Sequence, residues 1–138
     1  MGRFDEIPGG APSFRAHNAM FWLDDGIMLG KHLPHEPNVT LEDVIEAFQK
    51  FKGMTGGELV PFVVDARGLA RLGYDARAYI RASSPEVFSH IAIVVKPELI
   101  RLLSHAFIGV SGMEVPVQLF TDEEEAWSFA TAHRSDAA

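Results

Sequence analysis

The sequence of 138 residues contains no cysteine, which excludes disulfide bonds, thiol catalysis and cysteine-ligated zinc. It is also short of positive charge: 12 Lys and Arg stand against 19 Asp and Glu, a net charge of −7. That balance argues against electrostatic binding to nucleic acid or to an anionic membrane surface. No apolar run approaches the roughly 18 residues of a transmembrane helix, and no charged-then-apolar signal peptide opens the chain. We therefore expect a cytoplasmic protein with no membrane span and no nucleic-acid partner.

What is present is enough for one folded domain. The length is close to the roughly 150 residues of a typical domain, and hydrophobic residues make up 47% of the chain, enough for a core. Residues 1–16 contain several Gly and Pro and show no hydrophobic period, so we expect a flexible N-terminal arm there. We assign a single domain to residues 17–134 and a disordered tail to residues 135–138.

The domain is expected to open with an antiparallel hairpin. Residues 19–23 are apolar at both alternate sets of positions, as in a strand that is covered on both faces. Asp25-Gly26 follows, and because Gly accepts positive φ this pair predicts a tight turn. Extended structure is expected to resume at Ile27.

Short apolar runs predict three further strands. Residues 62–64 and 91–95 are continuous apolar runs, which are typical of buried strands. Residues 115–120 predict a last strand that is short or lies at an edge, because Pro116 has no backbone N–H to donate.

Helix signals alternate with these strands. Thr40 and Asp43, and again Thr121 and Glu124, have the spacing of capping boxes, in which a side chain at each end satisfies a free backbone N–H. Helices are therefore expected to follow Thr40 and Thr121. The two other predicted helices span residues 74–82 and 99–108.

The resulting order is β-β-α-β-α-β-α-β-α. Buried strands that alternate with helices imply a mostly parallel sheet with right-handed crossovers, and the opening hairpin makes the sheet mixed. We predict an α/β fold with a mixed, mostly parallel sheet of about five strands and four helices.

Four segments of this pattern resemble a known fold family. They are Phe21-Trp22-Leu23-Asp24-Asp25-Gly26-Ile27, Pro61-Phe62-Val63-Val64-Asp65-Ala66-Arg67, Ala92-Ile93-Val94-Val95-Lys96 and the run from Pro116 to Ala126. Over roughly residues 18–133 the chain resembles the SpoIIAA-like fold, which is shared by STAS domains of anti-sigma-factor antagonists. More specifically, it resembles the uncharacterised small bacterial proteins grouped as STAS/SEC14-type domains.

The resemblance implies a switch whose key residue is missing. In anti-sigma-factor antagonists a phosphorylatable Ser follows the third strand, at the start of the next helix. The corresponding positions here are Gly73, Tyr74 and Asp75, and none of them is Ser or Thr. The phosphorylation switch is therefore not carried over, whereas partner binding and small-ligand binding stay open.

A basic concentration follows the strand that ends at Asp65. Parallel sheets bind ligands beyond the carboxyl ends of their strands, and Arg side chains near a helix N-terminus suit an anion such as phosphate or an acidic partner surface. The alternatives are that Asp65 caps its own loop and that the Arg side chains are solvated surface charges. The candidate ligand-binding residues are Asp65, Arg67, Arg71, Arg77 and Arg81.

No metal, cofactor or catalytic site is expected. His32, His35 and Glu36 are metal-ligand types, but Pro34 separates the two His, so a polar loop is the better interpretation. The glycines from Gly53 to Gly57 lack the Lys and the spacing of phosphate-binding loops, and Gly109-Val110-Ser111-Gly112 lacks the full nucleophile elbow.

The predicted helix over residues 99–108 is apolar on more than one face. A surplus apolar face in water favours burial by a second copy of the chain, so we predict a homodimer with Leu99, Leu103 and Phe107 at its interface. The alternative is that the N-terminal arm folds over this helix and is anchored there by Phe4 and Phe14.

Three functions remain in order of preference. The first is a non-catalytic interaction or regulatory module with a protein partner, in view of the resemblance and the missing catalytic motifs. The alternative is a carrier of a small apolar or anionic ligand near the strand ends, which a sizeable apolar pocket would favour. An enzyme is the third, and it would need a perturbed Asp or His in a cleft.

Overall fold

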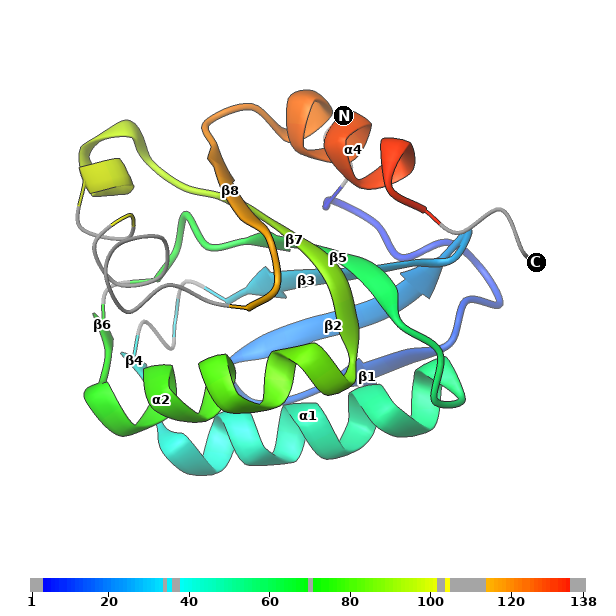
Figure 1. The fold of residues 1–138 in the computed structure, drawn as a ribbon, viewed down its shortest axis with the longest axis horizontal. Helices are drawn as coiled ribbons and strands as arrows, with labels where there is room; N and C mark the ends of the chain where they lie inside the picture. Colours follow the sequence, from blue (N-terminus) through cyan, green and yellow to red (C-terminus); the bar gives the residue numbers. More distant parts are fainter. Residues whose placement is uncertain are drawn as a thin grey trace.

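A computed structural model describes residues 4–33, 35, 38–69, 71–101, 104 and 114–134. A six-stranded sheet lies between two layers (Figure 1). Helices α1 (Leu41–Thr55) and α2 (Tyr74–Ser83) cover one face, and α4 (Glu123–Ala132) covers the other. This three-layer arrangement follows from helices that alternate with strands, because each helix buries its apolar stripe on a face of the sheet.

The sheet is mixed and mostly parallel, as predicted. The strand order is β1-β2-β3-β5-β7-β8. The first three strands pair antiparallel, and β3, β5, β7 and β8 pair in parallel. The strands are β1 (Ser13–Arg15), β2 (Ala19–Asp24), β3 (Ile27–His32), β5 (Val60–Asp65), β7 (Phe88–Val94) and β8 (Val117–Phe120).

Shorter elements lie outside the main sheet. Strands β4 (Asn38–Val39) and β6 (Arg71–Leu72) form a separate parallel pair. Two short 3₁₀ helices, η1 (Ser84–Glu86) and η2 (Pro97–Leu99), follow α2 and β7.

The opening hairpin and the two central strands are confirmed. Asp25 and Gly26 have φ values of 55° and 77°, which is the left-handed pair that a tight two-residue hairpin turn needs. Strands β5 and β7 are neighbours, and Val64 pairs with Ile93 in their register. The two apolar runs therefore occupy the middle of the sheet.

The prediction of a flexible arm over residues 1–16 is wrong for part of that segment. Ser13–Arg15 form β1, and Phe14 stacks on Phe21 with ring centroids 5.6 Å apart. Phe4 is only 3% exposed and meets Trp22 edge to face at 6.3 Å. A three-residue strand is too short to show an alternating pattern, so the sequence carries no periodic signal for it.

Three of the four predicted helices are found among the described residues as α1, α2 and α4, and the fourth, predicted over residues 99–108, lies largely outside the described residues. The capping box of Thr40 and Asp43 at α1 is confirmed, with both hydrogen bonds formed. At α4 the N-cap is Asp122, one residue later than predicted, because its carboxylate accepts from the backbone N–H of Glu124.

The two faces of the sheet have separate hydrophobic cores. One lies under α1 and α2 and contains most of the phenylalanines, including Phe48, Phe51 and Phe88. The other lies under α4 and includes Phe4 and Trp22 from the N-terminal half of the chain. Successive side chains of a strand point to opposite faces of the sheet, so alternate residues enter different cores. No described helix is both long enough and apolar enough to cross a membrane.

Candidate functional site

An apolar cavity of about 160 Å³ lies between the sheet and helices α1 and α2. Its floor comes from β2, β3, β5 and β7, and its roof from α1, α2 and η1. Val39 of β4 and Leu72 of β6, which are paired in register, lie at one end. The lining residues are Asn18, Ala19, Phe21, His32, Val39, Val44, Ala47, Phe48, Phe51, Phe62, Val64, Ala66, Leu69, Leu72, Ile80, Ser84, Phe88, Ile91 and Ile93.

The local sequence explains why these side chains meet. Val44, Ala47, Phe48 and Phe51 follow the i, i+3, i+4, i+7 spacing of one helical face, so α1 presents all four to the sheet. Ala47 is the smallest of them, and its methyl group leaves space beneath the helix. On the sheet, Phe62 and Val64 point to the cavity, whereas Val63 between them enters the opposite core.

The exposed surface of Phe62 and Val64 is consistent with an unfilled space beside β5. Both belong to β5, a central strand that lies beneath two helices, where side chains are normally buried. Val63 of the same strand is completely buried, yet Phe62 and Val64 are only half-buried. The difference arises because the surface of Phe62 and Val64 borders a space that other side chains leave unfilled.

Aromatic rings make the wall rigid. Phe62 and Phe88 stack at 4.5 Å with an interplanar angle of 8°. Phe51 contacts Phe21, Phe48, Phe62 and Phe88 with ring centroids 4.8 to 5.6 Å apart. Offset stacks and edge-to-face contacts of this kind fix ring orientation, so the cavity is preformed.

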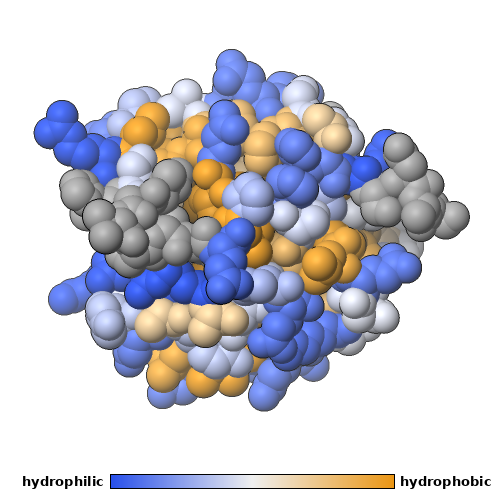
Figure 2. Space-filling model, viewed as in Figure 1, coloured by the Kyte–Doolittle hydropathy of each residue, from blue (hydrophilic) through white to orange (hydrophobic). Residues whose placement is uncertain are grey.

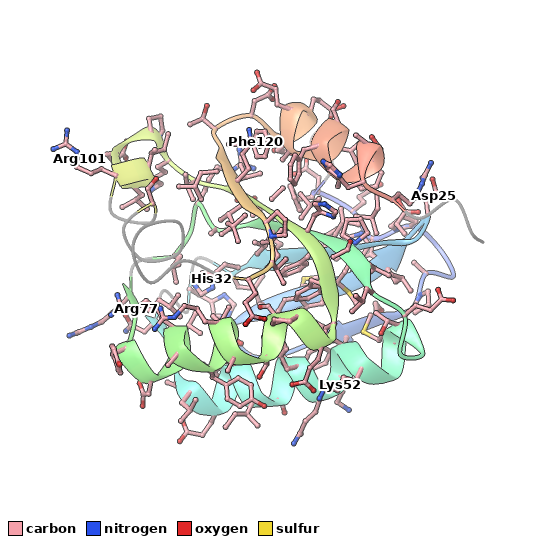
Figure 3. The ribbon with its side chains drawn as sticks, viewed as in Figure 1. Asp25, His32, Lys52, Arg77, Arg101 and Phe120 are labelled. Carbon is pink, nitrogen blue, oxygen red and sulfur yellow. The ribbon has the colours of Figure 1, made fainter. Side chains whose placement is uncertain are left out.

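Two polar residues of the lining, Asn18 and His32, are neighbours in the sheet, although the surface of the cavity is almost wholly apolar. Ala19 of β2 pairs with His32 of β3, and Asn18 precedes Ala19. Asn18 and His32 are 5% and 7% exposed. The backbone N–H of Leu33 donates to the carbonyl of Asn18 at 2.8 Å, which holds this residue against the end of β3. In Figure 3, His32 lies in the space between the sheet and α2.

The side chain of Asn18 is the unusual group in this set. Its Oδ1 is buried and has no hydrogen-bond partner among the described residues. Ser84, the other small polar residue in the lining, donates its hydroxyl to the carbonyl of Ile80 at 2.6 Å and is satisfied. A buried acceptor without a described partner costs free energy of folding.

No Asp, Glu, Lys or Arg is among the lining residues that the structure describes. An isolated ion in such a cavity would lose its hydration without a counter-charge, at a cost of several kcal/mol. The cavity therefore suits neutral, mainly apolar molecules, and its described lining offers no acidic side chain for acid–base chemistry.

The residues proposed to bind an anion do not form one cluster. Asp65 and Arg67 lie on the α4 side of the sheet, whereas Arg71 lies on β6 and Arg77 and Arg81 lie on α2. No described residue pairs with Arg71 or Arg77. In Figure 3, Arg77 lies at the same end of the molecule as His32.

Arg67 is committed to contacts within the chain. Its Nε and Nη2 donate to the two carboxylate oxygens of Asp65, both at 2.9 Å, and Nη2 also donates to Glu123 at 2.7 Å. Hydrogen bonds to Asp65 are the main cause of a raised pKa for Arg67, with burial opposing and Glu123 adding to the rise. This network ties the carboxyl end of β5 to the first turn of α4. Asp65 also accepts from the backbone N–H of Arg67, which fits the loop-capping role considered for it.

His32 and His35, the two described residues of the metal-ligand type, differ in their environments. His32 is buried beside the cavity, His35 is exposed, and Glu36 lies outside the described residues. Among the residues that the structure describes, no three His, Asp or Glu side chains are placed to hold a metal ion.

A second histidine site lies under α4. His90 of β7 stacks on His133 with ring centroids 3.9 Å apart, and Phe129 meets both rings. Burial, with a smaller contribution from the neighbouring His133, lowers the pKa of His90.

The predicted dimer interface is only partly described. Leu103 and Phe107 lie outside the described residues. Leu99 is half-buried and packs against the core under α1 and α2, and its neighbour Ile100 is 37% exposed. Phe4 and Phe14, the alternative anchors, pack on the sheet. On the face of the molecule seen in Figure 2, hydrophobic residues lie in the middle, where Figure 1 places β8.

This architecture defines an α/β protein with a SpoIIAA-like fold, as the sequence resemblance implied. Among solved structures the chain is similar to an uncharacterised protein of the DUF3478 family from Shewanella loihica PV-4, which has that fold. The TM-score is 0.55 and the identity 15%, over 87% of this chain and 91% of that chain. The chain belongs to the family described as domain of unknown function DUF7793, whose model matches residues 21–134. No curated protein matches it.

Sequence reasoning missed the cavity. Its lining comes from elements as far apart in the chain as β2 and β7, and no local pattern joins them. The available signal was the apolar residues of β2 and of helix α1 on the faces that meet, and it does not show where space is left between them.

Proposed function

We propose that this protein binds a small apolar molecule in the cavity between the sheet and helices α1 and α2. The observation that carries the proposal is an apolar cavity walled by packed aromatic rings, between the sheet and two helices. Protein interiors contain few voids larger than a water molecule, and ligand sites are apolar spaces with a few placed polar groups. This is the carrier alternative, and the absence of charged side chains from the described lining favours an apolar ligand over an anionic one.

The size of the cavity limits the ligand. A volume of about 160 Å³ is close to that of an engineered apolar cavity of roughly 150 Å³ that takes up benzene or xenon. It is smaller than the roughly 300 to 1,000 Å³ of drug-sized sites. The ligand is therefore a single ring or a short chain, or a larger molecule of which only one such group enters.

Filling the cavity with a ligand is expected to be energetically favourable. At about 24 cal/mol per Å³, a fully enclosed apolar cavity of 160 Å³ would cost on the order of 4 kcal/mol of folding stability, which is an upper bound for this partly open one. A ligand that fills the cavity restores the lost contacts. The apolar lining also excludes a well-bonded water cluster, since water needs two to four polar partners.

Calorimetric titration of the full chain with toluene tests the proposal. Ala47→Leu places a larger side chain inside the cavity, and we expect it to weaken toluene binding by about tenfold or more. Ala82→Leu makes the same change on the exposed side of α2 and is the matched control, expected to bind as the wild type does. Mass spectrometry of the protein under native conditions would add the identity of any molecule that purifies with it.

The outcomes separate clearly. Saturable binding by the wild type and the Ala82→Leu variant, with loss in Ala47→Leu, supports the proposal. Equal binding by all three proteins, or no binding by the wild type, rejects it.

A second candidate is the interaction or regulatory module. It is favoured by the SpoIIAA-like fold and by the exposed side chain of Ile100 beside the apolar segment over residues 99–108. In this candidate the segment binds a second copy of the chain. Light scattering on the full chain, with and without Phe107→Glu, tests it: a dimer that the substitution dissociates supports this function, and a wild-type monomer rejects it.

A further inference from the structure

The cavity is partly open, and its lining shows where it meets solvent. The lining residues on α1 and most of those on the sheet are buried. Those that lie outside the sheet and are half-buried come from β4, the loop between β5 and β6, β6 and α2; they are Val39, Leu69, Leu72 and Ile80. We call these four residues the mouth of the cavity. Because they border the space and also keep exposed surface, a molecule longer than the cavity can leave part of itself outside at this point.

Arg77 lies next to this mouth, in the first part of α2. It comes three residues before Ile80, so the two side chains are neighbours on one face of the helix. Figure 3 shows Arg77 at the same end of the molecule as His32, which is another lining residue. Arg77 is not itself part of the lining, so its charge lies outside the apolar space.

Arg77 is half-buried and has no hydrogen-bond or ion-pair partner among the described residues. The carboxylate nearest to it in the sequence, Asp75, accepts instead from the backbone N–H of Ala76 at 3.2 Å. In a chain with 19 acidic and 12 basic side chains, acidic partners are in excess, and Arg67 and Arg134 both have one. The planar fork of N–H donors on Arg77 is therefore left for a group outside the chain, and this fork matches a carboxylate or a phosphate.

We infer that the ligand is a small amphipathic anion, whose apolar ring or short chain fills the cavity and whose carboxylate or phosphate group binds Arg77 at the mouth. This inference rests on the proposed function and adds the chemical class of the ligand. The anionic group stays outside the apolar lining, so it keeps part of its hydration and avoids the cost of burying a charge. The cavity holds the apolar part, and Arg77 selects the group attached to it.

Three probes that share a phenyl ring on a short chain test the inference: hydrocinnamate, phenethyl phosphate and the neutral hydrocinnamyl alcohol. Each is titrated calorimetrically into the full chain, in the wild type and in Arg77→Met, which removes the charge and keeps an apolar stem. The comparison is the ratio of the Kd of the alcohol to the Kd of each anion. We expect the wild type to bind at least one anion more tightly than the alcohol, and Arg77→Met to lower that ratio about tenfold while alcohol binding is unchanged.

Lys52→Met is the matched control, because it also removes one positive charge from the helical layer. Lys52 lies in the last turn of α1, and Figure 3 shows it away from Arg77. The Lys52→Met variant is expected to keep the wild-type ratio. Arg77→Gln serves as a second variant if Arg77→Met does not fold, and the same lowering of the ratio is expected.

A ratio that falls in Arg77→Met and not in Lys52→Met supports the inference, and the anion with the lower Kd identifies the head group as a carboxylate or a phosphate. A ratio that is equal in the wild type and in Arg77→Met, with toluene bound by both, overturns the inference and leaves the apolar-ligand function standing. Tighter binding of the alcohol than of both anions by the wild type also overturns it. Failure of the wild type to bind toluene and all three probes overturns both proposals.

Discussion

The ring of Phe21 lies against the backbone of Gly30. A Cβ atom built on Gly30 would stand 2.9 Å from two carbons of the Phe21 ring and 3.1 Å from Cε1 of Phe62. Gly30 faces the cavity side of β3, between Met28 and His32, so a missing side chain is what allows the two rings to approach the strand. The position of the floor of the cavity therefore depends on this glycine.

Gly30→Ala is expected to destabilise the protein by about 1–3 kcal/mol, because the added methyl group forces both rings away from the strand. Both rings line the cavity, so their displacement is expected to weaken toluene binding as well. Urea unfolding and calorimetry measure the two effects.

Gly53→Ala is the matched control. Nothing lies within 4 Å of a Cβ at Gly53, and the residue is inside α1. Alanine there is expected to raise the free energy of unfolding by up to about 1 kcal/mol through helix propensity. If Gly30→Ala and Gly53→Ala changed the free energy of unfolding equally, the close contact of Phe21 and Phe62 with Gly30 would not be the cause.

Arg67→Met is expected to lower the free energy of unfolding by about 1–3 kcal/mol, because it removes the side-chain donors of the buried Asp65 carboxylate and the link to Glu123. The loss should be largely independent of toluene, since Arg67 lies on the opposite side of the sheet from the cavity. Denaturant unfolding with and without toluene measures this.

Arg77→Met provides the comparison for Arg67. No described residue pairs with Arg77, so its replacement is expected to change stability by less than about 0.5 kcal/mol. A loss at Arg77 as large as that at Arg67 would show that the ion-pair network is not the cause.

Acid is expected to destabilise the protein through His90. Its pKa in the folded protein is lowered from the ordinary value of 6.5, so below about that pH the unfolded chain binds more protons than the folded one. The contribution of His90 is therefore fully present above pH 6.5 and is lost as the pH falls toward the lower folded pKa. Urea midpoints at about pH 7.5 and about pH 5.5 measure the loss.

His90→Phe keeps a ring beside His133 and Phe129 but cannot titrate. Its urea midpoint should depend less on pH over this interval than that of the wild type. An unchanged pH dependence would assign the effect to other groups.

Much of the sheet could be predicted from local patterns, because continuous apolar runs and an Asp-Gly turn are strong signals. Residues 62–64 and 91–95 became neighbouring central strands for that reason. Strand β1 could not be predicted, since its three residues are held by pairing with β2 and by the Phe14–Phe21 stack and not by an alternation of their own.

The candidate site was predicted less well than the fold. The five polar residues from Asp65 to Arg81 are close in sequence, but neighbouring strand positions point to opposite faces. Val64 borders the cavity, and Asp65 faces α4. The cavity itself depends on where α1 and α2 stand over the sheet, a distance set by the packing of the phenylalanines and not visible in the order of residues.

The most direct test of the central claim is the crystal structure of the protein soaked with bromobenzene, recorded at a wavelength where bromine scatters anomalously. The account predicts one dominant anomalous peak between the sheet and helices α1 and α2, bordered by Phe48, Phe62 and Ile91. Crystals of the Ala47→Leu variant should lack that peak. Bromine found only on the outer surface, or a cavity that stays empty while surface sites fill, would contradict the claim that this protein binds small apolar molecules there.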